Sequence, residues 1–421
     1  MNTKQIKFDN SEFDSIDISK LNEISKFPCD IFIMLSKNKL IKIFSENDLI
    51  DHSRLINLST KGIKILYFKK GELSLESNNT SNTFEKNYIP LRISTLLANK
   101  VVPFSIYYLN TDEALTLLFK EDSTITDEQL NDLKTKRIVQ AFIDDKNEQE
   151  YQDYIDNNLK QIISQDNLAI EDKANIIGNH ICSKLENVMA DTNEVNLKKL
   201  NLVQEHFQTF IKTNTESIGK LIKILTKDNQ TIYNHSLVVG SLSYVTILEI
   251  NRMREDETLS SKVKMFDEYT LNSDEIKNII FTGALLHDIG KIILCIEKGL
   301  MLASNTLPAM VPVEVIHEHS KAGYEHLKKF KSVHPKALEI VLQHEESCDG
   351  SGIPNQLPKT QISFYTQIIS LANYYDNLTS KNSLPCEEAL NEMEKSIIKF
   401  NKYLFPIFKK VILNIEHHLP S

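Results

Sequence analysis

The sequence predicts an α+β N-terminal module followed by an all-α helical bundle. Three observations lead to this fold class. The first 146 residues contain an internal repeat, and the spacing of apolar residues becomes helical from about Glu148 onward. The whole chain of 421 residues has only 11 Gly and 11 Pro. This low content favours helices over a sandwich of many short strands joined by turns.

The internal repeat has an offset of 75 residues, fixed by aligning Pro28 with Pro103. Residues 31–33 then fall on 106–108, and residues 67–68 fall on 142–143, without a gap. Each copy has the pattern of a strand hairpin, a short helix and a final strand. In the first copy the helix would carry Leu55 and Leu58 on one face. We therefore expect residues 1–146 to form a tandem hairpin-helix-strand repeat that serves as a sensory or interaction module.

The remaining residues have helical periodicity and few helix breakers. We expect residues 147–215 to form a helical connector and residues 216–421 to form the bundle. The last helices would close this bundle with an apolar face. That face would contain Leu390, Met393, Ile397, Phe400 and Leu404.

Composition and charge exclude several classes of protein. The formal net charge is -9, and there is no Lys/Arg block, so we expect no binding to DNA or RNA. The N-terminal MNTKQIKFDN has no apolar core, and no uninterrupted apolar run reaches the length of a membrane span, so we expect no signal peptide and no membrane segment. The five cysteines form no CxxC pair. They indicate reduced thiols in a cytoplasmic protein.

A set of histidines and oxygen ligands in the C-terminal half predicts a metal centre. Its members are His235, the adjacent pair His287 and Asp288, His319, the adjacent pair His344 and Glu345, and Asn373. Imidazoles and carboxylates without a thiolate suit Fe or Mn better than a structural Zn site. Asp288 has two oxygens and can bridge two divalent ions, which together bind a phosphodiester and activate water. Lys291 lies one turn further along and can reach a phosphate oxygen.

The order of these motifs resembles the HD-GYP family. The chain has HDIGK at residues 287–291, then H-x-x-x-G at 319–323, then H-x-E-x-x-D-G-x-G-x-P at 344–354, and the resemblance extends over about residues 201–406. It implies an HD-type helical bundle, two or three Fe or Mn ions, and hydrolysis of cyclic di-GMP to pGpG or GMP.

The resemblance also implies a role for each matching residue. One ion would be bound by His235, His287, Asp288 and Asn373, and the second by Asp288, His319, His344 and Glu345. Asp288 and Lys291 would be catalytic, with Lys291 on the scissile phosphate. The turn after Glu346 would contact the substrate through Asp349, Gly350, Gly352 and Ile353.

Several positions depart from the family pattern. Glu345 stands where the family has a second histidine, and Asn373 stands where it has an aspartate. Ile353 replaces the tyrosine of Gly-Tyr-Pro, and Thr231 replaces a glutamate that binds a third ion in some members, so we expect two ions. We expect a phosphodiesterase with an altered metal site that acts on cyclic di-GMP or a related cyclic dinucleotide. The alternative is a degenerate domain that binds a nucleotide or a protein signalling partner without turnover. A homodimer is left open.

Overall fold

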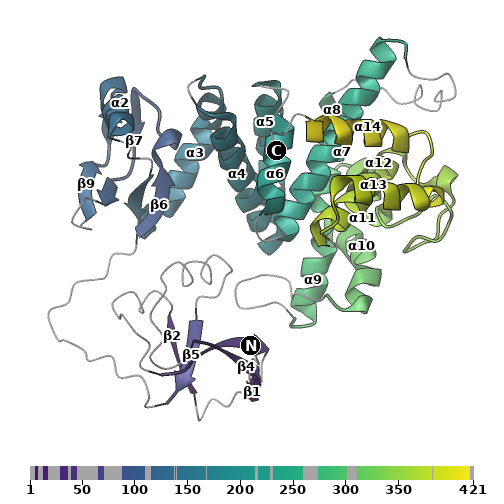
Figure 1. Ribbon diagram of the computed structural model, residues 1–421, viewed down its shortest axis with the longest axis horizontal. Coiled ribbons are helices and arrows are strands. Elements are labelled where there is room, and N and C mark those ends of the chain that lie inside the picture. The colour runs from purple at the N-terminus through teal and green to yellow at the C-terminus, as the bar shows by residue number, and fades with distance from the viewer. Residues whose placement is uncertain are drawn as a thin grey trace. The chain divides into compact units, whose positions relative to one another are not determined.

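Strands occupy the N-terminal part of the computed structural model, and helices follow from Glu148 onward (Figure 1). The structure describes residues 5–7, 13–17, 29–36, 39–44, 65–70, 88–109, 115–136, 138, 140–166, 168–213, 217–227, 231–258, 274–300, 311–381 and 383–417. The chain divides into two compact units. One contains the first strands, and the other contains residues 85–300 and 309–421. This division falls between the two predicted copies of the repeat.

The first unit contains an antiparallel sheet with strand order β1-β4-β3-β5-β2. Its strands are β1 (Gln5–Lys7), β2 (Phe13–Asp17), β3 (Ile31–Ser36), β4 (Lys39–Phe44) and β5 (Ile65–Lys69). Phe13 and Phe32 pack edge to face, with ring centroids 5.6 Å apart. The helix expected around Leu55 and Leu58 lies outside the described residues.

The second unit begins with a sheet of order β6-β11-β8-β9 and a two-stranded ribbon β10-β7. The elements are β6 (Tyr88–Arg92), β7 (Lys100–Val102), β8 (Ile106–Leu109), β9 (Leu115–Phe119), β10 (Ser123–Ile125), α2 (Asp127–Thr135) and β11 (Gln140–Asp144). Helix α2 begins with a capping box between Thr126 and Gln129.

The strand registers of the two sheets correspond at the repeat offset found in the sequence. The corresponding pairs include Ile31↔Phe44 with Ile106↔Phe119, and Phe13↔Lys69 with Tyr88↔Asp144. Each sheet therefore has the same hairpin and the same antiparallel partner for its last strand. The tandem arrangement of two complete copies in one module stays a prediction.

Four helices follow the second sheet: α3 (Glu148–Ile163), α4 (Ile170–Ala190), α5 (Glu194–Thr213) and α6 (Ser217–Lys227). The Tyr154 hydroxyl on α3 accepts a hydrogen bond from the Leu97 N–H at 2.9 Å, which fixes α3 to the segment after β6. Phe207 on α5 stacks on Phe281, with ring centroids 4.2 Å apart. This stack joins the predicted connector to the helical bundle.

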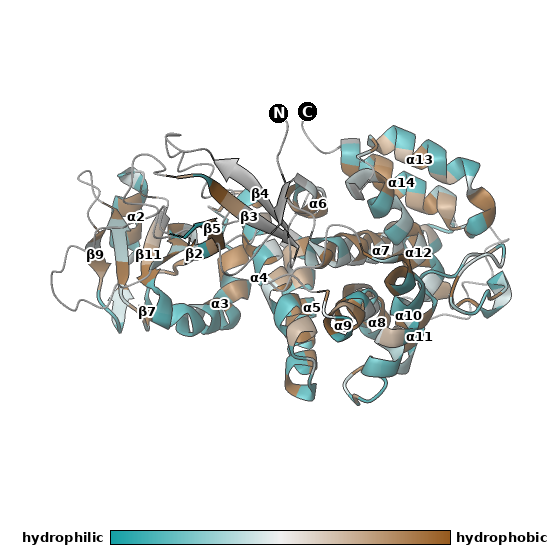
Figure 2. Cartoon of the chain, turned by 90° about the horizontal axis from the view of Figure 1, so that it is seen from below, coloured by the Kyte–Doolittle hydropathy of each residue, from teal (hydrophilic) through white to brown (hydrophobic). Residues whose placement is uncertain are grey.

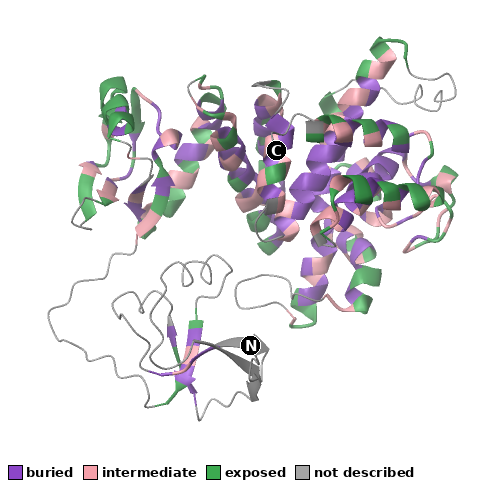
Figure 3. Cartoon of the chain, in the orientation of Figure 1, coloured by how far each residue is buried: buried purple, intermediate pink, exposed green. Residues whose placement is uncertain are grey.

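Helix α7 (Ile232–Glu255) carries His235 and is buried around most of its circumference (Figure 3). The other helices are α8 (Asp274–Leu286), α9 (Ile289–Glu297), α10 (Val313–Leu327), α11 (Pro335–Gln343), α12 (Phe364–Asp376), α13 (Cys386–Lys395) and α14 (Phe405–His417). Helix α7 contacts α8, α12 and α14 on one side and α4 and α6 on another. Thr231 caps α7 by accepting a hydrogen bond from the Asn234 N–H.

Helices α9 and α10 lie unusually close together because Gly290 faces α10. A Cβ atom at Gly290 would overlap the His319 carbonyl oxygen and lie 2.7 Å from the Gly323 nitrogen. Only a residue without a side chain fits this contact. The glycines of HDIGK and H-x-x-x-G thus bring the two helices together and place His319 beside Asp288.

Among the described residues, one segment is long and apolar enough to cross a membrane by length and composition, Asp274–Glu297. It comprises α8 and α9, whose hydrophobic residues are visible in Figure 2. Its apolar window is 78% buried inside the protein, as in a core helix, and it contains His287 and Asp288.

Candidate metal centre

The predicted histidines and Asp288 come from four places in the bundle and meet in its interior. His235 lies on α7, His319 on α10, and His344 directly after α11. His287 and Asp288 form a two-residue turn between α8 and α9. The exposed fraction of these side chains is 8% or less: His235 8%, His287 0%, Asp288 2%, His319 0% and His344 0%.

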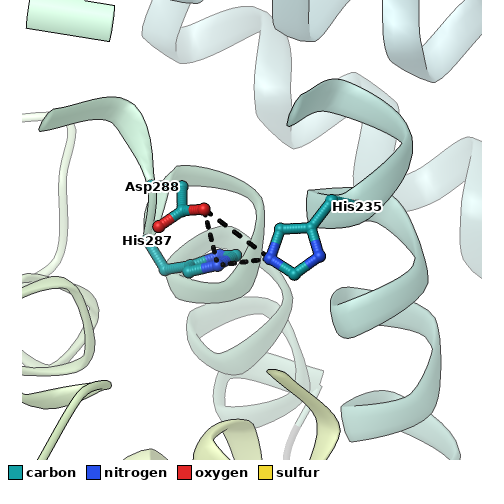
Figure 4. Close-up of side chains that lie close together, drawn as sticks. All are labelled: His235, His287 and Asp288. Carbon is teal, nitrogen blue, oxygen red and sulfur yellow. Dashed lines mark hydrogen bonds and ion pairs between the residues drawn. The ribbon is translucent and has the colours of Figure 1, made fainter. Parts of the chain in front are cut away.

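The first group of ligand atoms consists of His235, His287 and Asp288, and we call it the His235 group (Figure 4). The Nε2 atoms of His235 and His287 are 3.2 Å apart. Asp288 Oδ2 lies 3.6 Å from His235 Nε2 and 3.5 Å from His287 Nε2. Three ligand atoms at these separations surround a common point, as a bound cation requires.

The second group consists of Asp288, His319 and His344, and we call it the His344 group. The Nε2 atoms of His319 and His344 are 2.9 Å apart. Asp288 Oδ1 lies 3.2 Å from His319 Nε2 and 3.5 Å from His344 Nε2. The two carboxylate oxygens of Asp288 therefore face different groups, as a carboxylate that bridges two cations would.

The hydrogen bonds of the imidazoles fix which nitrogen carries the proton. Nδ1 of His287, His319 and His344 faces the backbone carbonyl oxygen three residues earlier, at 2.6, 2.6 and 2.9 Å. A carbonyl only accepts, so each Nδ1 must donate and each neutral ring has its lone pair on Nε2. Lone pairs that face one another at about 3 Å repel unless a cation lies between them. This arrangement fits bound metal ions.

His235 has a different partner on its far side. Its Nδ1 lies 2.5 Å from Asp376 Oδ2, and the other Asp376 oxygen accepts a hydrogen bond from the Ser380 hydroxyl at 2.7 Å. A carboxylate behind a histidine orients the ring and makes its other nitrogen a stronger metal ligand. Asp376 is 2% exposed, so this carboxylate lies inside the bundle.

Electrostatics keep His287 and His319 neutral and Asp288 anionic. Burial lowers the pKa of His287 and His319, and the nearby Asp288 carboxylate only partly opposes this effect. Burial alone would raise the pKa of Asp288, but the Lys291 ammonium and the surrounding imidazoles hold it well below its ordinary value. Lys291 Nζ lies 2.5 Å from Asp288 Oδ2. Asp288 Oδ1 has no hydrogen-bond donor within the described part of the chain, which leaves it open to a cation.

Glu345 and Asn373 lie at the border of the His344 group. Glu345 Oε1 is 3.7 Å from His344 Nε2 and 4.0 Å from His319 Nε2. Burial would raise the pKa of Glu345, but His344 and Lys291 lower it, so the side chain is a carboxylate. Asn373, which was expected beside His235 and His287, donates from Nδ2 to Glu345 Oε1 at 3.4 Å.

The turn that was expected to contact substrate is held by its own hydrogen bonds. Asp349 Oδ1 accepts from the Ser351 N–H at 3.0 Å and from its hydroxyl at 2.7 Å. The Gly350 N–H donates to the Ser347 carbonyl, and the Ile353 N–H donates to the Glu345 carbonyl. A Cβ at Gly352 would overlap the backbone of residues 346–347. Substrate contacts by this turn stay a prediction.

Glu346 anchors the same turn, and sequence reasoning did not single it out. Its carboxylate is 4% exposed and accepts hydrogen bonds from the N–H groups of Asn355 at 2.7 Å and Leu357 at 2.9 Å. The acidic residue next to the predicted ligand Glu345 was the available signal. Glu346 thus ties the loop beyond Pro354 to the end of α11.

Comparisons with known proteins agree with this geometry. A sequence model of the HD domain family matches residues 245–399. The chain is 27% identical over 218 residues to a cyclic di-GMP phosphodiesterase of Thermotoga maritima, which covers 48% of this chain and 58% of that protein. It is 27% identical over 170 residues to the 3'3'-cGAMP-specific phosphodiesterase 2 of Vibrio cholerae, covering 40% and 31% of the two chains.

A solved structure extends the likeness beyond the bundle. An HDGYP protein from Bdellovibrio bacteriovorus aligns with a TM-score of 0.51 and 21% identity, covering 78% of this chain and all of that one. The C-terminal region of this chain is an HD-GYP domain. The strand-rich N-terminal region of the chain precedes this helical HD domain, as the sequence predicted. The chain spans only about a third to three fifths of the lengths of the two curated relatives.

Proposed function

We propose that this HD-GYP domain hydrolyses a phosphodiester bond of cyclic di-GMP or a related cyclic dinucleotide with the help of two divalent cations, Fe or Mn. One observation carries the proposal: the His235 group and the His344 group share Asp288, with one carboxylate oxygen facing each. Paired cations that share a carboxylate suit the attack of water on a phosphodiester. The names of the two curated relatives support a cyclic dinucleotide as substrate.

The donor set supports Fe or Mn as the bound ions. Four imidazole nitrogens and carboxylate oxygens, without a thiolate among the ligand atoms, are ligands that both metals accept. When bound, such ions neutralise phosphate charge and activate water at neutral pH. Asp288 and the imidazoles would hold the ions, and the backbone carbonyls behind His287, His319 and His344 keep the Nε2 atoms of these rings directed into the two groups.

The chain's own residues would position the substrate. Lys291 is a cation at the border of the centre, with an exposed side-chain fraction of 12%, and we propose that it binds an oxygen of the scissile phosphate. Asp349, Gly350, Gly352 and Ile353 form the turn beside Glu345, and we propose that the dinucleotide lies against this turn. A cytoplasmic location and a signalling role for the N-terminal strands belong to the same proposal.

The test is hydrolysis by the full chain after anaerobic purification with Fe²⁺ or Mn²⁺. We expect cyclic di-GMP or 3'3'-cGAMP to be converted to a linear dinucleotide, measured by chromatography. His319→Ala should remove the activity, whereas His317→Ala should retain it, because His317 lies on the same helix but is exposed. Binding of a dinucleotide without product would support the degenerate alternative and reject the proposal.

A further inference from the structure

Glu345 places a carboxylate oxygen beside the His344 group. Its Oε1 lies within 4.0 Å of both imidazole nitrogens of the His344 group. The exposed fraction of its side chain is 31%, so it stands where the buried centre meets the surface. A small rotation of this side chain can bring the oxygen into contact with a cation bound by His319 and His344.

Asn373 is oriented to hold Glu345. A carboxylate only accepts hydrogen bonds, so Asn373 must turn its NH₂ group toward Glu345, as observed at 3.4 Å. Its oxygen then points the other way and accepts from Asn377 Nδ2 at 3.0 Å. Both ends of the Asn373 amide are therefore engaged, and the chain Asn377–Asn373–Glu345 ends at the His344 group.

The charge around the two groups is consequently unequal. The His235 group has two imidazoles and one oxygen of Asp288. The Asp376 carboxylate lies behind the His235 ring on its far side, and Lys291 Nζ lies 2.5 Å from that same Asp288 oxygen. The His344 group has two imidazoles, the other Asp288 oxygen and the nearby Glu345 carboxylate. An added anionic ligand strengthens cation binding, and a nearby ammonium weakens it.

We infer that the two cation sites differ in affinity, that the His344 group fills first, and that Glu345, positioned by Asn373, causes the difference. The inference rests on the metal centre of the proposed function and deepens it. Hydrolysis that needs both cations would follow occupancy of the weaker His235 group. The metal supply would therefore regulate turnover, with the half-loaded protein folded but inactive.

The test is a titration of metal-free full chain with Mn²⁺, measured by equilibrium dialysis. We expect two binding steps separated by about tenfold or more in affinity. Glu345→Gln should weaken the tighter step by about 10- to 100-fold and leave the weaker step unchanged. Asn373→Ala should weaken the same step by less, and His235→Ala should remove only the weaker step. Glu339→Gln is the matched control, because Glu339 is exposed on α11.

Several results would overturn the inference. Glu345→Gln with both steps unchanged would exclude Glu345 as the cause, and loss of the tighter step in His235→Ala would reverse the order of filling. Two equal steps in a protein that hydrolyses a cyclic dinucleotide would reject the inference and keep the proposed function. Two unequal steps without hydrolysis would keep the inference and reject the proposed function. No Mn²⁺ binding at all would reject the inference and the proposed function together.

Discussion

Replacing Gly290 by alanine tests whether the contact between α9 and α10 positions the metal centre. The new Cβ would overlap the His319 carbonyl oxygen and lie 2.7 Å from His319 C and Gly323 N. Favourable contacts between such atoms need about 3.5 Å, so the two helices would have to separate by about 0.8 Å or more. The atoms in the way are backbone atoms, which cannot rotate aside as the end of a side chain can.

Two opposing effects decide the magnitude of this change. Alanine is favoured over glycine inside a helix by about 1 kcal/mol. Overpacking in a core costs about 1–3 kcal/mol and occasionally more, and the rigid surroundings of Gly290 favour the upper end. We therefore expect Gly290→Ala to lower the free energy of unfolding by about 2 kcal/mol or more.

Urea unfolding of the full chain, followed by helical circular dichroism, would measure this loss. Gly323→Ala is the matched comparison on the facing helix, where the new Cβ would meet Val341 Cγ1 at 3.1 Å and Gly290 N and Ile289 Cγ2 at 3.2 Å. A few tenths of an ångström of movement relieve these contacts, so we expect a change of less than about 1 kcal/mol. A Gly290→Ala protein within about 0.5 kcal/mol of the original chain would refute the reasoning.

Three further predictions concern charge and protonation. Asp376→Asn should weaken Mn²⁺ binding to the His235 group by about 10-fold or more, because the anionic partner of His235 Nδ1 is lost. Unchanged isotherms in equilibrium dialysis would contradict this prediction. Lys291→Met should slow dinucleotide hydrolysis while metal content, measured by atomic absorption, is retained, and an unchanged rate would exclude a role on the phosphate. Burial lowers the pKa of His180 to about 3 and of His206 to about 4. Both folded-state pKa values lie below the unfolded value of about 6.5. The free energy of unfolding is therefore undiminished above about pH 6.5, and at lower pH it decreases by about 1.4 kcal/mol per pH unit for each histidine. His180→Gln should reduce this slope in urea midpoints measured between pH 7.5 and 5.5, and an identical slope would show that other groups cause it.

Residue type and motif order in the sequence single out five residues that the fold brings together: His235, His287, Asp288, His319 and His344. Their role as metal ligands stays a prediction. The helical C-terminal half followed from periodicity, which a bundle requires of every helix that packs against its core.

The remaining features depend on contacts between residues far apart in the chain. Asp376 pairs with His235 across 141 positions, and no local pattern distinguishes such a carboxylate from one on a helix surface. The residue type of Asn373 suggested a metal ligand. Its orientation, however, depends on hydrogen bonds with Asn377 and Glu345, which residue type alone does not reveal. Its place in the ligand set, and the substrate contacts of the turn from Asp349 to Ile353, stay predictions.

The backbone carbonyls behind three of the imidazoles have a consequence for how metal enters the protein. Because Nδ1 holds the proton of His287 and His319, and burial lowers the pKa of both rings, each of these rings can accept an ion without first releasing a proton. Deprotonation of these two rings should then contribute no buffer-dependent heat to metal binding in calorimetry. The backbone carbonyls of the helices keep the Nε2 lone pairs of these rings directed toward the ion, whichever side chains surround the rings.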